Sequence, residues 1–179
     1  IPVIFCGVNA DPAEYGYPDK NITGVLERGH FRESLAFFRQ ISPQSEKIGI
    51  ITRDSPSGKA FLAQIRQESA SYPCTIHTIE VIESVSELDA NSELEESDAL
   101  LIASFMGILG PDDTSLDVEG FLHYLTERYN KPIIGANFFH VSSGALCAVV
   151  KTGQEQGETA AKKLLEALRG TPVEEIAVT

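Results

Sequence analysis

The feature that most constrains the fold is a series of short, nearly continuous apolar runs separated by helix-like segments. Such runs are typical of strands that helices cover on both faces of a sheet. We expect five buried parallel strands and a sixth strand nearer an edge: Val3–Val8, Lys47–Thr52, Ala99–Ala103, Pro132–Ala136 and Leu146–Val150, with Thr75–Ile82 as the sixth. Strands that alternate with helices predict right-handed βαβ units, and therefore an α/β fold with parallel sheets and flanking helices.

The intervening segments carry helix start and stop signals. Ser55 followed by Pro56 predicts an N-cap with proline at the first helical position. Thr152 and Glu155 have the spacing of a capping box. We expect helices from Phe31, from Ser55, over Leu116–Tyr129 and from Thr152 to about Gly170, with a weaker helix over Ser86–Glu96.

These elements predict one complete lobe and part of a second. Residues 47–137 read β-α-β-α-β-α-β, which is a compact four-stranded core. Val3–Val8 and the segment after Ala145 lie outside it, and one strand with one helix cannot cover a sheet on both faces. We therefore assign residues 1–28 to the end of lobe one and a crossover, 29–143 to lobe two, and 144–179 to a crossover strand and return helix. The chain opens on a strand without an initiator methionine, so we expect further sequence upstream.

Composition and motifs exclude several classes of function. The net charge of −12 argues against nucleic-acid or anionic-membrane partners, because both require a basic surface. The sequence lacks a Walker loop, a GxGxxG turn, a GxSxG elbow and an HExxH helix. Its three cysteines do not have metal-site spacing, and Asp112, Asp113 and Asp117 fit no calcium loop. We expect no enzymatic activity, no cofactor and no metal.

Polar and aromatic side chains instead follow several predicted strands. Open α/β sheets bind ligands beyond the carboxyl ends of their strands, where these residues stand. Amide, hydroxyl and aromatic groups suit a small polar or zwitterionic ligand with an apolar body. The predicted contacts are Asn9 and Asp11 after the first strand, Ser104 and Phe105 after Ala99–Ala103, and Asn137 and Phe138 after Pro132–Ala136; Arg53 and Asp54 also follow a strand.

Three stretches of the sequence also carry a family resemblance. They read PVIFCGVN near the start, NITGV at Asn21–Val25, and KPIIGANFF…GAL…GQEQGETAAKKLLEALRG at the end. Together they resemble the ABC-transporter substrate-binding family of periplasmic-binding-protein fold, over Ile1–Val178. Phe5–Asn9, Tyr17–Glu27 and Gly153–Gly157 resemble still more closely the motifs of the variant that forms the extracytoplasmic sensor region of bacterial histidine kinases and diguanylate cyclases.

The resemblance implies two lobes of the type I binding-protein kind, with a small-molecule ligand between them. It places Thr23, within the NITGV motif, among the ligand contacts. It also implies an extracytoplasmic location, and a membrane permease or a fused signalling module as partner. The chain would begin late in lobe one.

The sequence departs from the transporter-type pattern at three places. Those members usually have acidic residues where Asn137 and Thr152 stand, and a polar stretch where this chain has the apolar Phe105–Leu109. The identity of the ligand therefore does not carry over from amino-acid-binding members.

Two alternative interpretations remain open at this point. One is a flavodoxin-like or receiver-like domain, although the run Ala99–Ala103 ends in Ser104-Phe105 and not in a phosphorylatable aspartate. The other is a dimerisation domain without a ligand, in which Phe105–Leu109 forms the interface.

Overall fold

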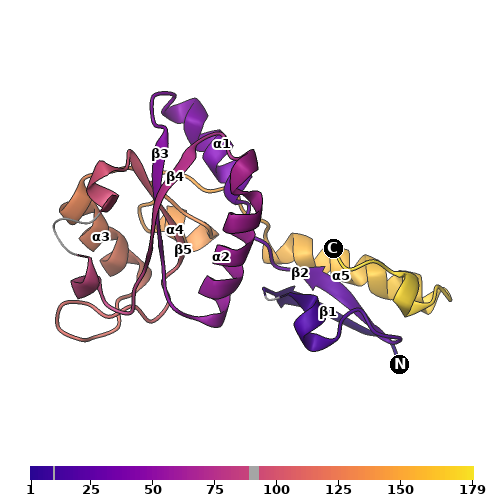
Figure 1. Ribbon diagram of the computed structural model, residues 1–179. Coiled ribbons are helices and arrows are strands. Elements are labelled where there is room, and N and C mark those ends of the chain that lie inside the picture. Colours follow the sequence, from indigo (N-terminus) through magenta and orange to yellow (C-terminus); the bar gives the residue numbers. More distant parts are fainter. Residues whose placement is uncertain (10, 89–92) are drawn as a thin grey trace. The chain divides into compact units, whose positions relative to one another are not determined.

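The computed structural model describes residues 1–9, 11–88 and 93–179. The chain divides into two compact units (Figure 1). Unit 1 comprises Ile1–Arg28 and Lys151–Thr179, and unit 2 comprises Gly29–Val150. Each unit combines parallel strands with helices, which confirms the predicted α/β class.

Unit 2 is built around a four-stranded parallel sheet. Its strands are β3 (Lys47–Thr52), β4 (Thr75–Val81), β5 (Ala99–Ser104) and β6 (Ile133–Ile134), in the order β4-β3-β5-β6. The chain moves outward from β3 to β4 and then returns to place β5 on the other side of β3. The strand order therefore reverses between β3 and β5.

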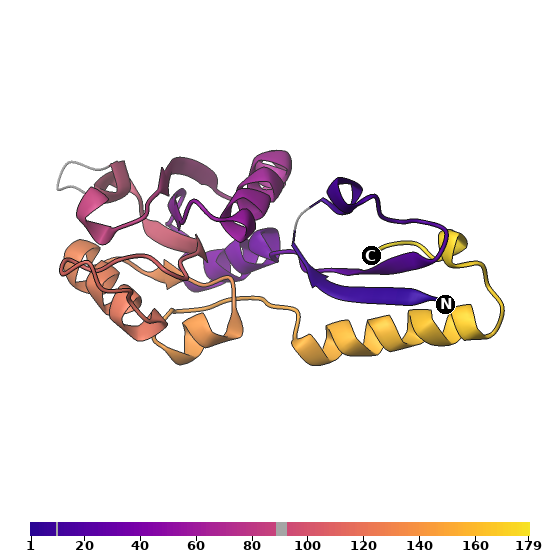
Figure 2. The same cartoon turned by 90° about the horizontal axis from the view of Figure 1, so that it is seen from below.

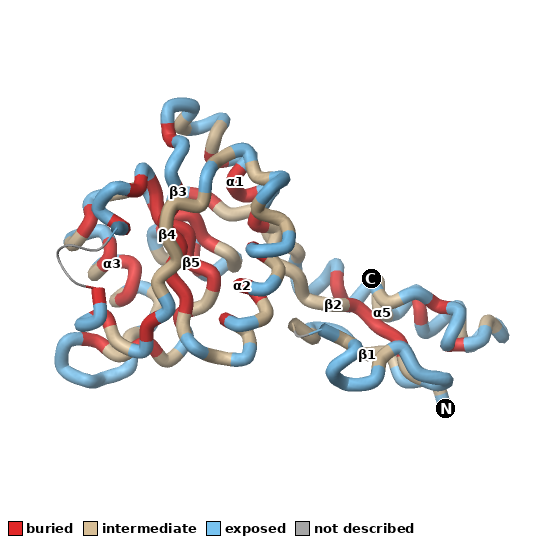
Figure 3. The backbone as a smooth tube through the Cα atoms, viewed as in Figure 1, coloured by how far each residue is buried: buried red, intermediate tan, exposed pale blue. Residues whose placement is uncertain are grey.

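Helices cover both faces of this sheet (Figure 1). Helices α1 (Phe31–Ile41) and α2 (Pro56–Glu68) pack on one face, and α3 (Val118–Tyr129) packs on the other. Alternate residues of β3 point to opposite faces, so Ile50 packs with α1 and α2 while Ile51 packs on the side of α3. Residues 48–52 of β3 and 99–103 of β5 are all buried, and Figure 3 shows the buried central strands.

Side chains cap the starts of α2 and α3, and of these two caps the one at Ser55 was predicted from the sequence. The Ser55 hydroxyl accepts a hydrogen bond from the Gly58 amide at 3.0 Å, and Pro56 begins α2. Asp117 caps α3 in the same way, accepting from the Gly120 amide at 2.8 Å.

Two of the predicted strands differ from the structure. The run Pro132–Ala136 contributes only Ile133–Ile134, and a short helix, α4 (Phe138–Ser142), follows it. Leu146–Val150 is not a strand, since Cys147 alone forms a bridge to Ile134. The backbone of Val149 is hydrogen-bonded to a side chain instead of a neighbouring strand.

The segment between β4 and β5 also differs from its prediction. In place of a helix over Ser86–Glu96 the structure has two 3-10 helices, η3 (Val85–Glu87) and η4 (Glu93–Glu96). Residues 89–92 lie outside the described part of the chain. Val85 and Leu94 are both fully buried, so packing of isolated apolar side chains, and not a helical stripe, holds this connection.

Unit 1 pairs β1 (Val3–Val8) with β2 (Ile22–Leu26) in parallel, and α5 (Gly153–Leu168) packs on both strands, as the view in Figure 2 shows. The capping box at Thr152 is present as predicted. Strand β2 was not predicted as a strand. The prediction that Val3–Val8 is buried is wrong, since Val3 is 50% exposed.

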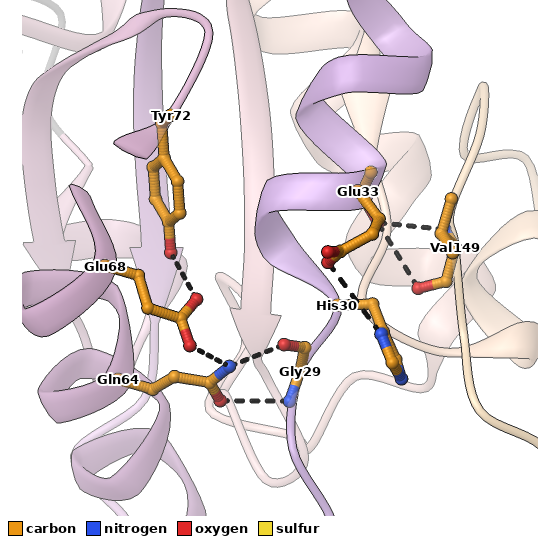
Figure 4. A network of polar contacts seen from close by, with 8 residues as sticks. Gly29, His30, Glu33, Gln64, Glu68, Tyr72 and Val149 are labelled. Atoms are coloured by element: carbon orange, nitrogen blue, oxygen red, sulfur yellow. Dashed lines mark hydrogen bonds and ion pairs between the residues drawn. The ribbon is translucent and has the colours of Figure 1, made fainter. Parts of the chain in front are cut away.

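Two side chains attach the ends of unit 2 to its own helices (Figure 4). Gln64 of α2 accepts from the Gly29 amide at 3.0 Å and donates to the Gly29 carbonyl at 2.6 Å. The Ser34 hydroxyl of α1 accepts from the Val149 amide at 2.8 Å and donates to the Val149 carbonyl at 3.3 Å. Both main-chain groups of Gly29 and of Val149 are thus hydrogen-bonded, although neither residue lies in a sheet.

We expect Gln64→Leu to destabilise unit 2 by roughly 1–2 kcal/mol, because it removes both hydrogen bonds to Gly29 while keeping the side-chain volume. Amide hydrogen exchange at Gly29 should become faster. Gln67→Leu, on an exposed position of the same helix, is the matched control and should change neither quantity. Unchanged protection of Gly29 in the Gln64 variant would contradict this role.

Candidate ligand-binding site at the sheet edge

The carboxyl edge of the unit 2 sheet contains a topological switch point. Strand order reverses between β3 and β5, and open α/β sheets bind ligands outside the carboxyl ends of their strands at such a reversal. Arg53 directly follows β3, and Ser104 ends β5. The Arg53 amide donates to the Ser104 carbonyl at 2.9 Å, which joins the two strand ends.

Two predicted contacts at this edge have polar groups that the fold does not use. Asn137 is the N-cap residue of α4, but its side chain makes no capping hydrogen bond. In the described part of the chain, neither the Asn137 amide nor the Ser104 hydroxyl is hydrogen-bonded, and neither is buried. Both are therefore available to a ligand.

Arg53 is held across three strand ends. Its Nε donates to Glu83 Oε2 beyond β4 at 2.9 Å, and its Nη1 donates to the Met106 carbonyl beyond β5 at 2.9 Å. Gly107 has a φ of +89°, and a Cβ there would lie 2.5 Å from Nη1. Glycine is therefore required at 107 both by the backbone conformation and by the position of the guanidinium.

The aromatic residues of the edge separate into exposed and buried rings. Phe138 is 74% exposed and Met106 is 67% exposed, so both can meet a ligand. Phe105 is 1% exposed, and its ring stacks on Phe121 with the centroids 5.5 Å apart. In this conformation Phe105 cannot contact a ligand, and its role is to fill the core against α3.

Burial of Phe105 also changes the interpretation of the loop that contains it. Ile108 is fully buried as well, and only Met106 within Phe105–Leu109 is largely exposed. Most of the apolar surface of this loop thus lies in the core. The loop does not present the continuous apolar patch that the dimerisation interpretation requires.

His140 fixes α4 to the end of β6. Its Nδ1 accepts from the Ala136 amide at 3.0 Å, and the side chain packs so close to Gly135 that a Cβ there would lie 2.6 Å from the His140 Cβ. Burial lowers the pKa of His140 to about 4, so the ring is neutral at pH 7. This contact positions Asn137 and Phe138, yet the sequence did not distinguish His140 from the other histidines.

The three remaining predicted contacts lie in unit 1. Thr23 is fully buried and donates to the Ile176 carbonyl at 2.7 Å, so in this conformation it has a structural role. The Asp11 carboxylate accepts from the Ala13 amide at 2.9 Å and caps the 3-10 helix η1 (Pro12–Tyr15). The Asn9 amide, oriented with its nitrogen toward Glu27, can donate to that residue's carbonyl at 3.1 Å.

A separate open groove of about 520 Å³ lies between α3 and the turn after α4. Glu119, His123 and Thr126 line it with the Ser143–Gly144 turn. None of the seven predicted contact residues lines this groove.

Within residues 1–9, 11–88 and 93–179, no group of three or more histidine, cysteine, aspartate or glutamate side chains has the arrangement of a metal site. None of the helices in the same residues is both long enough and apolar enough to cross a membrane.

The sequence matches the family described as ABC transporter substrate binding protein over residues 1–179, the entire chain. The class that this match defines is that of substrate-binding proteins. The chain belongs to the ABC transporter substrate binding protein family, which sets aside the flavodoxin-like and receiver-like interpretation.

Individual relatives agree with this assignment. The chain is 26% identical to a tyrosine-binding protein of Clostridioides difficile over 186 residues, covering all of this chain and 52% of the relative. It thus spans about half the length of that relative.

Solved structures show the fold. CD0873, a substrate binding protein from Clostridium difficile in its ligand-free, open form, superposes with a TM-score of 0.72 at 17% identity, over 100% of this chain and 61% of that one. An ABC domain from Streptococcus pneumonia in complex with L-Trp superposes with a TM-score of 0.64 at 20% identity. The superposition covers 99% of this chain and 60% of that one. The predicted periplasmic-binding-protein-like fold is confirmed.

We expect the stability of the protein to fall by about 3 kcal/mol between pH 6.5 and pH 4 through His140 alone. The folded-state pKa lies below the unfolded value, so the unfolded state binds more protons in this window. The stabilisation is complete above pH 6.5 and is lost as the pH falls toward 4.

Urea denaturation across this pH range measures the effect. His140→Phe should be less stable at pH 7, because the Ala136 amide loses its acceptor, but its stability should depend less on pH. His123→Phe changes an exposed histidine of α3 and should keep the wild-type slope. Equal slopes in all three proteins would show that His140 is not the titrating group.

Proposed function

We propose that this chain is the ligand-binding part of an extracytoplasmic substrate-binding protein that binds a small molecule without transforming it. The observation that carries the proposal is the set of unused groups at the switch point of unit 2. The Ser104 hydroxyl and the Asn137 amide are not hydrogen-bonded in the described residues, and the exposed Phe138 ring directly follows Asn137 in sequence. Hydrogen-bonding groups next to an exposed ring suit an amphipathic ligand.

Relatives support an amino-acid-like ligand with an aromatic side chain. One is named for binding tyrosine, and a solved structure of the same fold contains L-Trp. Such ligands combine a polar head with a ring, which matches the amide of Asn137 and the ring of Phe138. A neutral amide at 137 also accepts a hydrogen bond from an ammonium group, although without the charge of a carboxylate.

The edge has the chemistry of a binding site more than that of a catalytic site. Ser104 has no hydrogen-bonded base in the described part of the chain, and a serine hydroxyl is a weak nucleophile without one. The nearby imidazole of His140 is buried, and its Nδ1 accepts from the backbone. These observations support a non-enzymatic role.

The partner that responds to the bound ligand belongs to the same proposal. A membrane permease is the partner that the family description suggests, and a fused signalling module is the one that the sensor-like motifs suggest. In either case the ligand acts by shifting the population of conformations toward the one it binds best.

We expect L-tyrosine, L-tryptophan or another compound in a screen of amino acids, nucleosides and small acids to raise the melting temperature of the full chain. Asn137→Ala and Phe138→Ala should each weaken binding by about tenfold in calorimetry, through a lost hydrogen bond or a lost ring contact. Phe37→Ala, which removes a 45% exposed ring from α1, is the control and should leave the affinity unchanged. The proposal fails if no compound in the screen binds.

A further inference from the structure

The proposed ligand-binding edge contains a cation that is fixed in place. The two hydrogen bonds of Arg53, from Nε to Glu83 and from Nη1 to the Met106 carbonyl, attach the guanidinium to the segments that follow β4 and β5, the strands on either side of β3. Gly107 leaves the space in which the guanidinium lies. A side chain held in this way loses little conformational entropy when it binds a ligand.

The guanidinium is not saturated by these contacts. It has five N–H donors and the two hydrogen bonds use two, which leaves three. In the described part of the chain Nη2 makes no hydrogen bond, and it is not among the buried polar atoms. The side chain is 32% exposed. Arg53 therefore presents donors to solvent at the switch point between β3 and β5.

We propose that Arg53 determines specificity by binding a carboxylate of the ligand, an inference that rests on the proposed function of this edge. The planar fork of a guanidinium matches the two oxygens of a carboxylate. The second group on that ligand is apolar, because Met106, whose carbonyl accepts from Arg53, and Phe138 expose large apolar side chains.

The charges around Arg53 favour a single carboxylate over a more highly charged anion. Glu83 pairs with Arg53, and Asp54 pairs with Lys59 at 2.8 Å, so two ion pairs occupy this corner. A ligand anion gains from direct contact with the guanidinium, whereas each additional negative charge meets the two carboxylates. We therefore commit to a monoanionic carboxylate and not to a phosphate.

The spacing of the sheet fits a ligand with a carboxylate at one end and a ring at the other. Arg53 follows β3 and Phe138 follows β6, with β5 between them. Two strand spacings amount to roughly 10 Å. A ring that reaches toward Phe138 can thus belong to a molecule whose carboxylate lies at Arg53.

The chain contains no tryptophan, so the fluorescence of an indole ligand reports binding without tryptophan emission from the protein. The probes are L-tryptophan, indole-3-propionate, which keeps the carboxylate, and tryptamine, which lacks it. We expect Arg53→Gln to weaken binding of the two carboxylates by about 10- to 100-fold and to leave tryptamine binding within about twofold. Wild-type protein should bind both carboxylates more tightly than tryptamine.

Two further variants separate recognition from structure. Arg53→Lys keeps the charge without the fork and should recover only part of the affinity. Lys59→Gln removes a neighbouring exposed cation. It should change the affinity for L-tryptophan by less than about threefold, since the Lys59 ammonium is not expected to bind the ligand carboxylate. Equal loss of tryptamine and tryptophan binding in Arg53→Gln would indicate a purely structural role and overturn the inference.

The remaining outcomes distinguish this inference from the proposed function. If Arg53→Gln binds L-tryptophan as tightly as wild type, or if the wild type binds only tryptamine or neutral compounds, the carboxylate role is wrong and ligand binding stands. Arg53-dependent binding of inorganic phosphate in preference to the carboxylates would also overturn it. If neither these probes nor the broader screen binds, the proposed function fails together with the inference.

Discussion

The constraint on which unit 2 depends is burial of its parallel sheet on both faces. Ile50 packs under α1 and α2 while Ile51 packs under the α3 side, so β3 cannot shift its register by one residue without exchanging the two cores. Because all strands run the same way, their carboxyl ends share one edge. Every group in the proposed site, from Arg53 to Phe138, lies at that edge for this reason.

Side chains stabilise the irregular backbone around this rigid sheet. Gln64 binds Gly29, Ser34 binds Val149, and His140 binds the Ala136 amide. Each contact supplies a main-chain group with the partner that a neighbouring strand would otherwise provide. These contacts hold the segments that leave the sheet, and the one made by His140 positions Asn137 and Phe138 at the edge.

Prediction from sequence succeeded where local chemistry decides the structure. Strand β3 and the cap at Ser55 were predicted because an apolar run or a hydroxyl before proline is informative alone. Prediction failed where contacts between residues far apart in the chain determine the local structure. Leu146–Val150 is apolar enough for a strand, but Ser34, far away in the chain, takes the backbone of Val149. Of the predicted contacts, Ser104, Asn137 and Phe138 reach one edge, whereas Phe105 could not be recognised as core without knowing that Phe121 stacks on it.

Phe105 and Phe138 illustrate how the fold separates core residues from exposed residues at the sheet edge. Both follow strands of the same sheet, and both are apolar. Phe105 is covered because α3 supplies Phe121 and α4 supplies His140 within ring-contact distance, whereas Phe138 sits at the start of α4 and remains exposed. The same distinction applies to polar groups. The Thr23 hydroxyl donates to the Ile176 carbonyl within the fold, whereas Arg53 has three N–H donors that make no hydrogen bond in the described part of the chain. Residue type alone therefore does not distinguish the proposed site. The distinguishing feature is that its polar and apolar groups, at the switch point, are left without partners among the described residues and remain able to contact a ligand.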